Sequence, residues 1–339
     1  MNQKKMLPLG VLAAVVLVLA AALALLQRGG EAEQTGIPLC AFSADAIDRL
    51  TYSGENTNVT LFKGEEGGWM LESDPTLPLE QQSVQSLLED VAGLTADRLL
   101  QGDELAAIPA RSDTPLMEFS IVSGAQTRTL TVDQANDVAD IYYVYDEEGT
   151  AYTVPQTELA GLCKTPRELY AAQQLTEQTI DEVATLQVGG LQFVQSDGVW
   201  TLADDPEYPL DQSAVKRMAN TLCGVQTEWS ITTPEADSAY GLDMPDVTVT
   251  AVFTDGASLT VRWGALTPGD ESLCYLASSA APTVVYEADA DYKSVFAVTR
   301  ESLYDETATA ETAEEEDTII AEHPVGGRDD YADTAGGES

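Results

Sequence analysis

The chain has 339 residues, with 16 lysines and arginines against 57 aspartates and glutamates, so its formal net charge is −41. An acidic surface of this kind repels phosphate backbones, which proteins hold through lysine and arginine, and we therefore expect no nucleic-acid binding. Hydrophobic residues make up 44% of the composition, which is too much for a wholly disordered chain. The length is sufficient for about two ordinary domains.

An uncharged apolar run occupies residues 7–26 near the N-terminus. A helix of this length, rising 1.5 Å per residue, spans the roughly 30 Å hydrocarbon core of a bilayer. Lys4 and Lys5 precede the run, and the chain turns acidic at Glu31 soon after it. The positive-inside rule then predicts a single transmembrane helix with residues 1–6 in the cytoplasm and the bulk of the chain outside the cell membrane.

A cleaved signal peptide is the alternative, because Ala22-Leu23-Ala24 has the small-x-small form of a cleavage site. Leu25 and Leu26 continue the apolar run past that point. The run also exceeds the apolar core of about 7 to 15 residues that is usual in signal peptides, which favours the uncleaved anchor. Both interpretations predict an extracytoplasmic protein, with residues 27–40 as a linker.

The exported part carries four cysteines, Cys40, Cys163, Cys223 and Cys274, and no CxxC spacing. A small exported domain that depended on disulfides would have more cysteines in a patterned spacing. Cys223 falls on the apolar side of a predicted helix and Cys274 in a predicted strand. We expect both to be buried free thiols that pack as small hydrophobic side chains.

The most specific signal in the sequence is a self-similarity at an offset of 131 residues. Nine identities fall in one ungapped alignment: Trp69/Trp200, Leu71/Leu202, Asp74/Asp205, Pro75/Pro206, Pro78/Pro209, Leu79/Leu210, Gln81/Gln212, Val84/Val215 and Gly93/Gly224. We interpret the chain as two tandem copies of one unit, residues 41–170 and 175–304.

Each copy begins with short strand-like runs and a tryptophan strand, continues through a proline loop into a helix, and then alternates with period 2. The expected helices have one apolar face each: Val84, Leu87, Leu88, Val91 and Leu94 in the first, and Val215, Met218, Ala219, Leu222 and Val225 in the second. In copy two, Val247–Phe253 and Ala257–Trp263 flank an Asp255-Gly256 hairpin turn, and a last helix is expected from Asp289 to about Val298. The pattern predicts an α+β fold, in which each copy is a meander of antiparallel strands with a packed helix.

The repeated motif Asp-Pro-x-x-Pro-Leu-acid supplies most of the candidate binding or structural residues. They are Trp69, Asp74, Pro75, Pro78 and Glu80 in copy one, and Trp200, Asp205, Pro206, Pro209 and Asp211 in copy two. One hypothesis is a repeated recognition loop. We favour a structural role, in which the prolines stiffen the turn and Glu80 or Asp211 caps the helix.

Copy two adds the segment Tyr240-Gly241-Leu242-Asp243-Met244-Pro245, which we interpret as a turn that feeds a strand. Together with Trp200, Pro206, Asp211, Asp255-Gly256, Gly264 and Tyr275 in this order, the segment resembles the bacterial domain of unknown function 4340. The similarity covers about residues 45 to 300 when both copies are counted, although copy one has no Tyr-Gly-Leu motif between Ile108 and Pro115. The resemblance implies a membrane-anchored protein without established activity, and by association an accessory of ABC-type transport systems of the gliding-motility-like kind.

Residues 305–339 contain 12 acidic residues, one basic residue and no periodic apolar pattern, which predicts a disordered tail. The single histidine, His323, lies in this tail, so we expect no histidine-based catalysis. Phosphate-loop, dinucleotide and zinc motifs are absent from the sequence, and we expect no cofactor. Calcium could use Asp133, Asp137, Asp140, Asp289 or Asp291, but neither run has the spacing of a calcium loop, so we favour solvated faces or helix caps.

Three functions remain in order of preference. The first is a non-enzymatic, single-pass, extracytoplasmic scaffold or accessory subunit of an ABC-type transport system. The second is a cell-envelope glycan-binding module that uses Trp69, Trp200 or the cluster Tyr142, Tyr143 and Tyr145. The third is a hydrolase that depends on two carboxylates.

Overall fold

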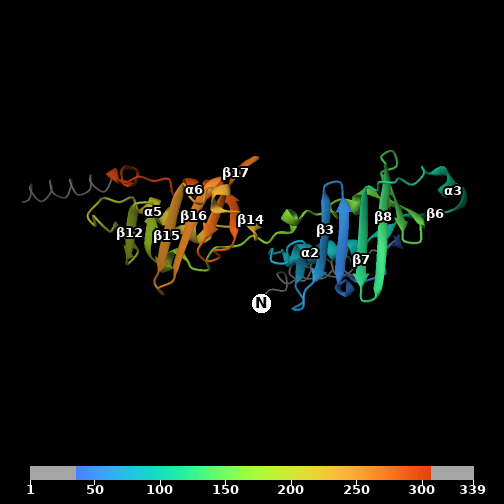
Figure 1. Cartoon of the computed structure of the whole chain (residues 1–339), viewed down its shortest axis with the longest axis horizontal. Coiled ribbons are helices and arrows are strands. Elements are labelled where there is room, and N and C mark those ends of the chain that lie inside the picture. The colour runs from blue at the N-terminus through green and yellow to red at the C-terminus, as the bar shows by residue number, and fades with distance from the viewer. Residues whose placement is uncertain (1–35, 307–339) are drawn as a thin grey trace, which may run out of the picture. The chain divides into compact units, whose positions relative to one another are not determined.

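The structure is a computed structural model that describes residues 36–306. The predicted transmembrane helix at 7–26 and nearly all of the predicted tail lie outside the described residues. Within residues 36–306, helices are too short or too polar to cross a membrane. The chain divides into two compact units, with the boundary between Ala171 and Ala172 (Figure 1).

Unit 1 is built on an eight-stranded antiparallel sheet with the order β4-β3-β2-β7-β8-β9-β10-β6. Its strands are β2 (Arg49–Gly54), β3 (Thr57–Lys63), β4 (Trp69–Leu71), β6 (Arg98–Leu100), β7 (Met117–Ser123), β8 (Gln126–Asn136), β9 (Ile141–Asp146) and β10 (Ala151–Pro155). Two further short strands, β1 (Ile37–Pro38) and β5 (Thr95–Ala96), pair with each other. The helices are α2 (Gln81–Ala92), α3 (Gly102–Ala107) and α4 (Gln156–Leu159), with 3-10 turns η2 (Ala44–Ala46) and η3 (Pro166–Leu169).

Unit 2 has an eight-stranded antiparallel sheet with the order β13-β12-β11-β15-β16-β17-β18-β14. Its strands are β11 (Val183–Val188), β12 (Leu191–Ser196), β13 (Val199–Leu202), β14 (Thr227–Ile231), β15 (Val247–Phe253), β16 (Ser258–Thr267), β17 (Asp270–Ser278) and β18 (Val285–Asp289). The helices are α5 (Gln212–Gly224) and α6 (Ala290–Ser294), with 3-10 turns η4 (Ile180–Glu182), η5 (Asp237–Ala239) and η6 (Glu301–Leu303). Antiparallel sheets with few helices confirm the mixed helix-and-strand class.

The strand order departs from the simple meander in the same way in both units. The helix α2 or α5 carries the chain from one edge strand, β4 or β13, to the opposite edge, where β6 or β14 pairs with the last strand. Neither β6 nor β14 was predicted from the sequence. Both are short, and the pairing of β14 shifts register between Thr227 and Trp229, so neither produces a clean alternation.

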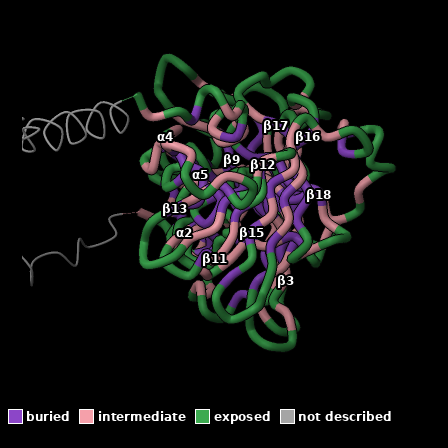
Figure 2. Tube along the Cα trace, turned by 90° about the vertical axis from the view of Figure 1, so that its left-hand side faces the viewer, coloured by how far each residue is buried: buried purple, intermediate pink, exposed green. Residues whose placement is uncertain are grey.

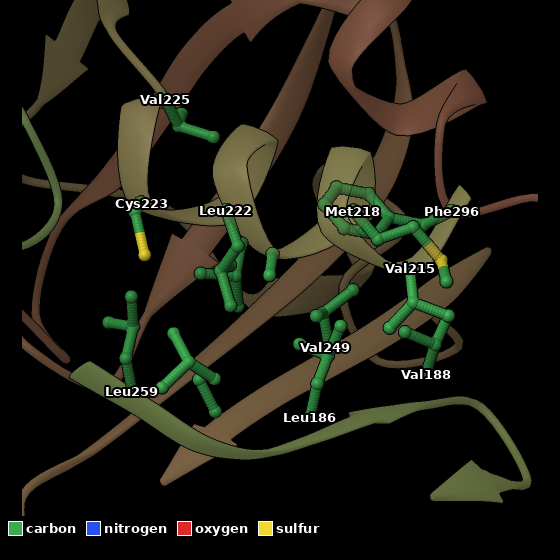
Figure 3. Packing of buried hydrophobic residues seen from close by; sticks show 14 of the residues in the cluster. Leu186, Val188, Val215, Met218, Leu222, Cys223, Val225, Val249, Leu259 and Phe296 are labelled. Carbon is green, nitrogen blue, oxygen red and sulfur yellow. The ribbon is translucent and has the colours of Figure 1, made fainter. Parts of the chain in front are cut away.

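The core of each unit lies between the helix and one face of the sheet. In α2 the buried residues Val84, Leu87, Leu88 and Val91 form the predicted apolar face, whereas Leu94, predicted as its last member, is buried beyond the end of the helix. Figure 3 shows Val215 and Leu222 of α5 on the side of the helix that faces Leu186 and Val249 of the sheet, with Met218 beside Phe296. Figure 2 shows burial concentrated along the strands. Each such side chain contributes about 1.5–3 kcal/mol through removal of apolar surface from water.

Residues at the ends of the units extend the predicted boundaries. Leu39 and Cys40, predicted as linker, are buried in unit 1, and Leu39 N–H donates to the Leu94 carbonyl at 3.0 Å. In unit 2, Thr227 N–H donates to the Gln173 carbonyl at 3.0 Å, so the unit begins before residue 175. Asp305, predicted as the first tail residue, donates its N–H to the Pro209 carbonyl at 2.8 Å.

The last helix is shorter than the predicted Asp289–Val298. The regular part, α6, covers Ala290–Ser294 and is capped by Asp289, whose side chain accepts from Asp291 N–H at 2.8 Å. Beyond it the backbone continues in tighter turns, with Phe296 N–H donating to the Lys293 carbonyl at 3.1 Å. These turns bring the Phe296 ring into the core, 6.0 Å from the ring of Trp263.

Candidate functional site

The two motif tryptophans lie at the edge strands β4 and β13. Trp200 is 1% exposed, and its side chain therefore offers no face for stacking on a sugar. Trp69 is 8% exposed and borders a hollow of about 470 Å³ at the turn between β3 and β4. The burial of both rings supports the predicted structural role of the tryptophans over stacking on a sugar.

A glutamine at the first position of each helix holds the tryptophan backbone. Gln81 Oε1 accepts from Trp69 N–H at 2.7 Å, and Gln81 Nε2 donates to the Trp69 carbonyl at 3.1 Å. Gln212 makes the same two bonds to Trp200, both at 2.8 Å. The glutamine side chain thus occupies the donor and acceptor that the tryptophan at this edge strand would otherwise present to another strand. This role of Gln81 and Gln212 was not predicted, although the two residues are identical in the repeat alignment.

The proline loop performs the structural role that the sequence predicted. Glu80 caps α2 by accepting from Gln82 N–H, and Asp211 caps α5 by accepting from Ser213 and Ala214 N–H. At the start of the first loop, the Asp74 carboxylate accepts from Thr76 N–H at 3.1 Å. The carboxylates of Asp74, Glu80 and Asp211 are therefore bound by the backbone of their own turns.

The last segment of each unit is hydrogen-bonded to the end of the proline loop of the same unit. In unit 1, Glu80 N–H donates to the Leu169 carbonyl at 2.8 Å, and in unit 2, Asp211 N–H donates to the Leu303 carbonyl at 2.9 Å. Unit 2 adds Arg300, which pairs with Asp205 at 2.5 Å. Pro75, Pro78, Pro206 and Pro209 lie within these loops.

The Tyr240-Gly241-Leu242 segment is the turn that precedes β15, as predicted, and Pro245 lies two residues before that strand. Leu242 is buried, and Gly241 has φ +70°, which favours glycine. Gly264 allows this segment to approach β16, because a Cβ atom there would collide with the Tyr240 carbonyl oxygen. Ala265 N–H donates to that same oxygen at 2.9 Å. The Tyr240-Gly241-Leu242 segment therefore packs closely against β16.

The tyrosine cluster in unit 1 is mostly covered. Tyr143 and Tyr145 are buried together with Leu100, and the guanidinium of Arg111 lies 4.9 Å from the centre of the Tyr145 ring. Tyr142 is half-buried and borders a hollow described below. The cluster is therefore a small second core rather than an open aromatic surface.

The candidate calcium ligands do not assemble into a site. Among residues 36–306 no group of three or more acidic, histidine or cysteine side chains is arranged to hold a metal ion. Asp133 is buried and accepts from Ser112 N–H at 2.9 Å, and Asp289 caps α6 as described above.

The four cysteines are free, and three of them are buried. Burial raises the pKa of Cys223 and of Cys274 to about 11. A thiol with so high a pKa carries little thiolate at neutral pH and is a poor nucleophile. The prediction of buried free thiols at Cys223 and Cys274 is confirmed.

Unit 2 has a cavity of about 770 Å³ beside α6, which we call the α6 cavity. Its walls come from the β11–β12 turn, the start of β15 at Val247, Leu266 of β16, and the segment between Ala290 and Arg300. Apolar atoms dominate these walls, and Leu266 remains 43% exposed. Ligand pockets typically have volumes of about 300–1,000 Å³.

Unit 1 has a smaller hollow in the corresponding place. It measures about 410 Å³ and lies between the start of β7 at Met117 and the α4 segment, where Leu159 and Cys163 contribute. The α4 segment follows the last strand of unit 1, as the α6 segment follows the last strand of unit 2. The same position in both units is therefore hollow, and unit 2 has the larger space.

The comparison with protein families bears on unit 2. The family model described as a domain of unknown function (DUF4340) matches residues 200–320. Residues 200–320 are therefore similar to this family. The match begins at Trp200 and contains the Tyr240-Gly241-Leu242 segment, Gly264 and the α6 segment, so the resemblance inferred from these residues is confirmed. Neither the curated proteins nor the solved structures gave a match.

Proposed function

We propose that the protein is a non-enzymatic, membrane-anchored, extracytoplasmic binding protein made of two repeats of one unit, and that it acts as an accessory or scaffold subunit of an ABC-type transport system. The α6 cavity is the observation that carries this proposal. The motif residues are engaged within the fold, whereas the cavity leaves apolar surface of unit 2 accessible. Accessible apolar surface of this kind marks a binding site.

The N-terminal attachment supports a position next to other membrane proteins. The apolar run ends at residue 26, and the chain is already paired in β1 at Ile37. The ten residues between them span at most about 36 Å when fully extended. Arg128 Nε donates to the Leu39 carbonyl at 2.9 Å, which fastens this end to β8. An anchor at 7–26 would therefore hold unit 1 close to the bilayer.

The lining of the cavity favours binding over hydrolysis. A hydrolase that depends on carboxylates needs two acids facing its substrate. Among the described residues that line the α6 cavity, Asp246 is the only acid, and its carboxylate is held by Lys293 Nζ at 2.6 Å.

Crosslinking in intact membranes, followed by detergent extraction and mass spectrometry, tests this function. We expect an ABC permease and its ATPase to co-purify in near-stoichiometric yield. Recovery of cell-envelope glycan alone, or of no partner, would contradict the proposal. The Ala297→Trp chain, which narrows the cavity mouth, should lose the partner, whereas Ala257→Trp in the β15–β16 turn should retain it.

A further inference from the structure

The charged groups around the α6 cavity restrict the chemistry of its partner. Two cations, Lys293 and Arg300, line the cavity together with Asp246. In a chain of net charge −41, two basic side chains at one cavity would by themselves suggest an anionic ligand.

Both cations are already engaged by the protein. Lys293 Nζ donates to the Asp246 carboxylate at 2.6 Å and to the Gly264 carbonyl at 3.1 Å. Arg300 pairs with Asp204 at 3.1 Å and with Asp205 at 2.5 Å. The two cations therefore face three carboxylates, which leaves a net charge of −1 for this set. An anionic ligand would have to displace these bonds.

The remaining surroundings are apolar and acidic. The Asp246 and Asp204 side chains, 62% and 71% exposed, are more open to solvent than their partners Lys293 and Arg300, which are 19% and 36% exposed. Val188, Val247 and Phe296 contribute apolar surface to the lining. A complementary partner therefore presents apolar side chains to this lining and positive charge to the exposed carboxylates.

We propose that the α6 cavity binds an apolar peptide segment that carries lysine or arginine next to its apolar side chains, supplied by a partner protein. The cavity volume of about 770 Å³ accommodates several apolar side chains, and the exposed Leu266 extends the apolar contact at the mouth. This inference rests on the proposed binding role of the cavity, but it does not require the partner to be a transporter.

Binding of two designed peptides to the full chain in lipid nanodiscs tests the inference. Both peptides have about 12 residues and the same leucine positions, and they differ in lysine or glutamate at the remaining positions. We expect the leucine-lysine peptide to bind at about 150 mM salt, where long-range attraction is screened. Ala297→Trp should weaken its binding at least about tenfold, whereas Ala257→Trp at the far end of β15 should leave it unchanged.

A second variant separates specific binding from general attraction to an acidic protein. Leu266→Lys adds a cation at the exposed mouth, and it should weaken binding of the lysine peptide without weakening that of the glutamate peptide. Equal or tighter binding of the glutamate peptide would overturn the inference, as would lysine-peptide binding that neither variant alters. Binding that appears only after deletion of residues 307–339 would assign the cavity to the chain's own tail and would also overturn it. Failure to recover a transporter from membranes, with peptide binding intact, would refute the proposed function alone.

Discussion

The side chain of Gln212 makes two hydrogen bonds with the backbone of Trp200, each at 2.8 Å: it accepts from the N–H and donates to the carbonyl. The same amide nitrogen reaches the Leu210 carbonyl at 3.3 Å. One residue therefore ties the edge strand β13, the proline loop and the start of α5 together. Gln81 repeats this arrangement around Trp69 and Leu79.

Replacement of this glutamine should destabilise unit 2 without affecting its overall fold. Gln212→Ala leaves the Trp200 N–H and carbonyl without their protein partner, which costs about 1–3 kcal/mol. Urea unfolding monitored by tryptophan fluorescence should show a lower midpoint. Gln192→Ala, on the neighbouring strand β12, is the control, and an equal effect of both changes would refute the special role of Gln212.

Gly264 should not tolerate a methyl group. In Gly264→Ala the Cβ atom collides with the backbone oxygen of Tyr240 and lies 3.2 Å from two side-chain carbons of Leu242. We expect a loss of about 2–4 kcal/mol, because a backbone atom cannot move aside cheaply. Gly224→Ala, where no atom lies within 4 Å of the added Cβ, should leave the melting temperature unchanged or slightly higher. A tolerated Gly264→Ala would contradict the close packing of this motif on β16.

Truncation of Trp200 should destabilise the protein more than its replacement by another aromatic ring. Its Nε1 is buried and finds no hydrogen-bond partner in the described part of the chain. Trp200→Phe removes that polar group and should cost less than about 2 kcal/mol, whereas Trp200→Ala should cost about 3–5 kcal/mol through the cavity it leaves. Thermal unfolding of both variants measures the difference. A Trp200→Ala chain as stable as the natural one would indicate that the tryptophan serves a surface role.

The free energy of unfolding should fall at alkaline pH because of the buried thiols. Burial raises the pKa of Cys274 in the folded state to about 11, above the ordinary thiol value near 8.5. The stabilisation is complete below about pH 8.5 and is lost as the pH rises toward 11, because the unfolded chain releases its proton first. Cys223 should contribute in the same window and direction. Cys274→Ala should flatten the fall in the free energy of unfolding between pH 8.5 and 11, and an unchanged slope would show that this thiol does not titrate there.

Local patterns in the sequence predicted the elements that local chemistry determines. The apolar spacing from Val84 to Val91 and the cap at Glu80 located α2, and Asp255-Gly256 located the β15–β16 hairpin. The edge strands β6 and β14 were missed, because their place is set by pairing with β10 and β18, which lie more than 40 residues later in the chain.

Less of the candidate site than of the fold could be predicted from the sequence. The identity of Gln81 and Gln212 was a usable signal, because a repeated polar residue at the start of a helix suggests a specific hydrogen bond. Its partner, however, lies on a strand that only the folded loop brings into reach. The α6 cavity combines residues from Val188 to Arg300 on separate elements, so no local pattern indicates it.

Site-specific photocrosslinking in native membranes tests the central claim most directly. A photoreactive phenylalanine derivative placed at Ala297, at the mouth of the α6 cavity, should capture a subunit of an ABC-type transporter through a segment that contains lysine or arginine. The same derivative at Ala257, in the turn at the far end of β15, should not capture it. Capture of the same transporter subunit from both positions, or of no protein from Ala297, would contradict the account.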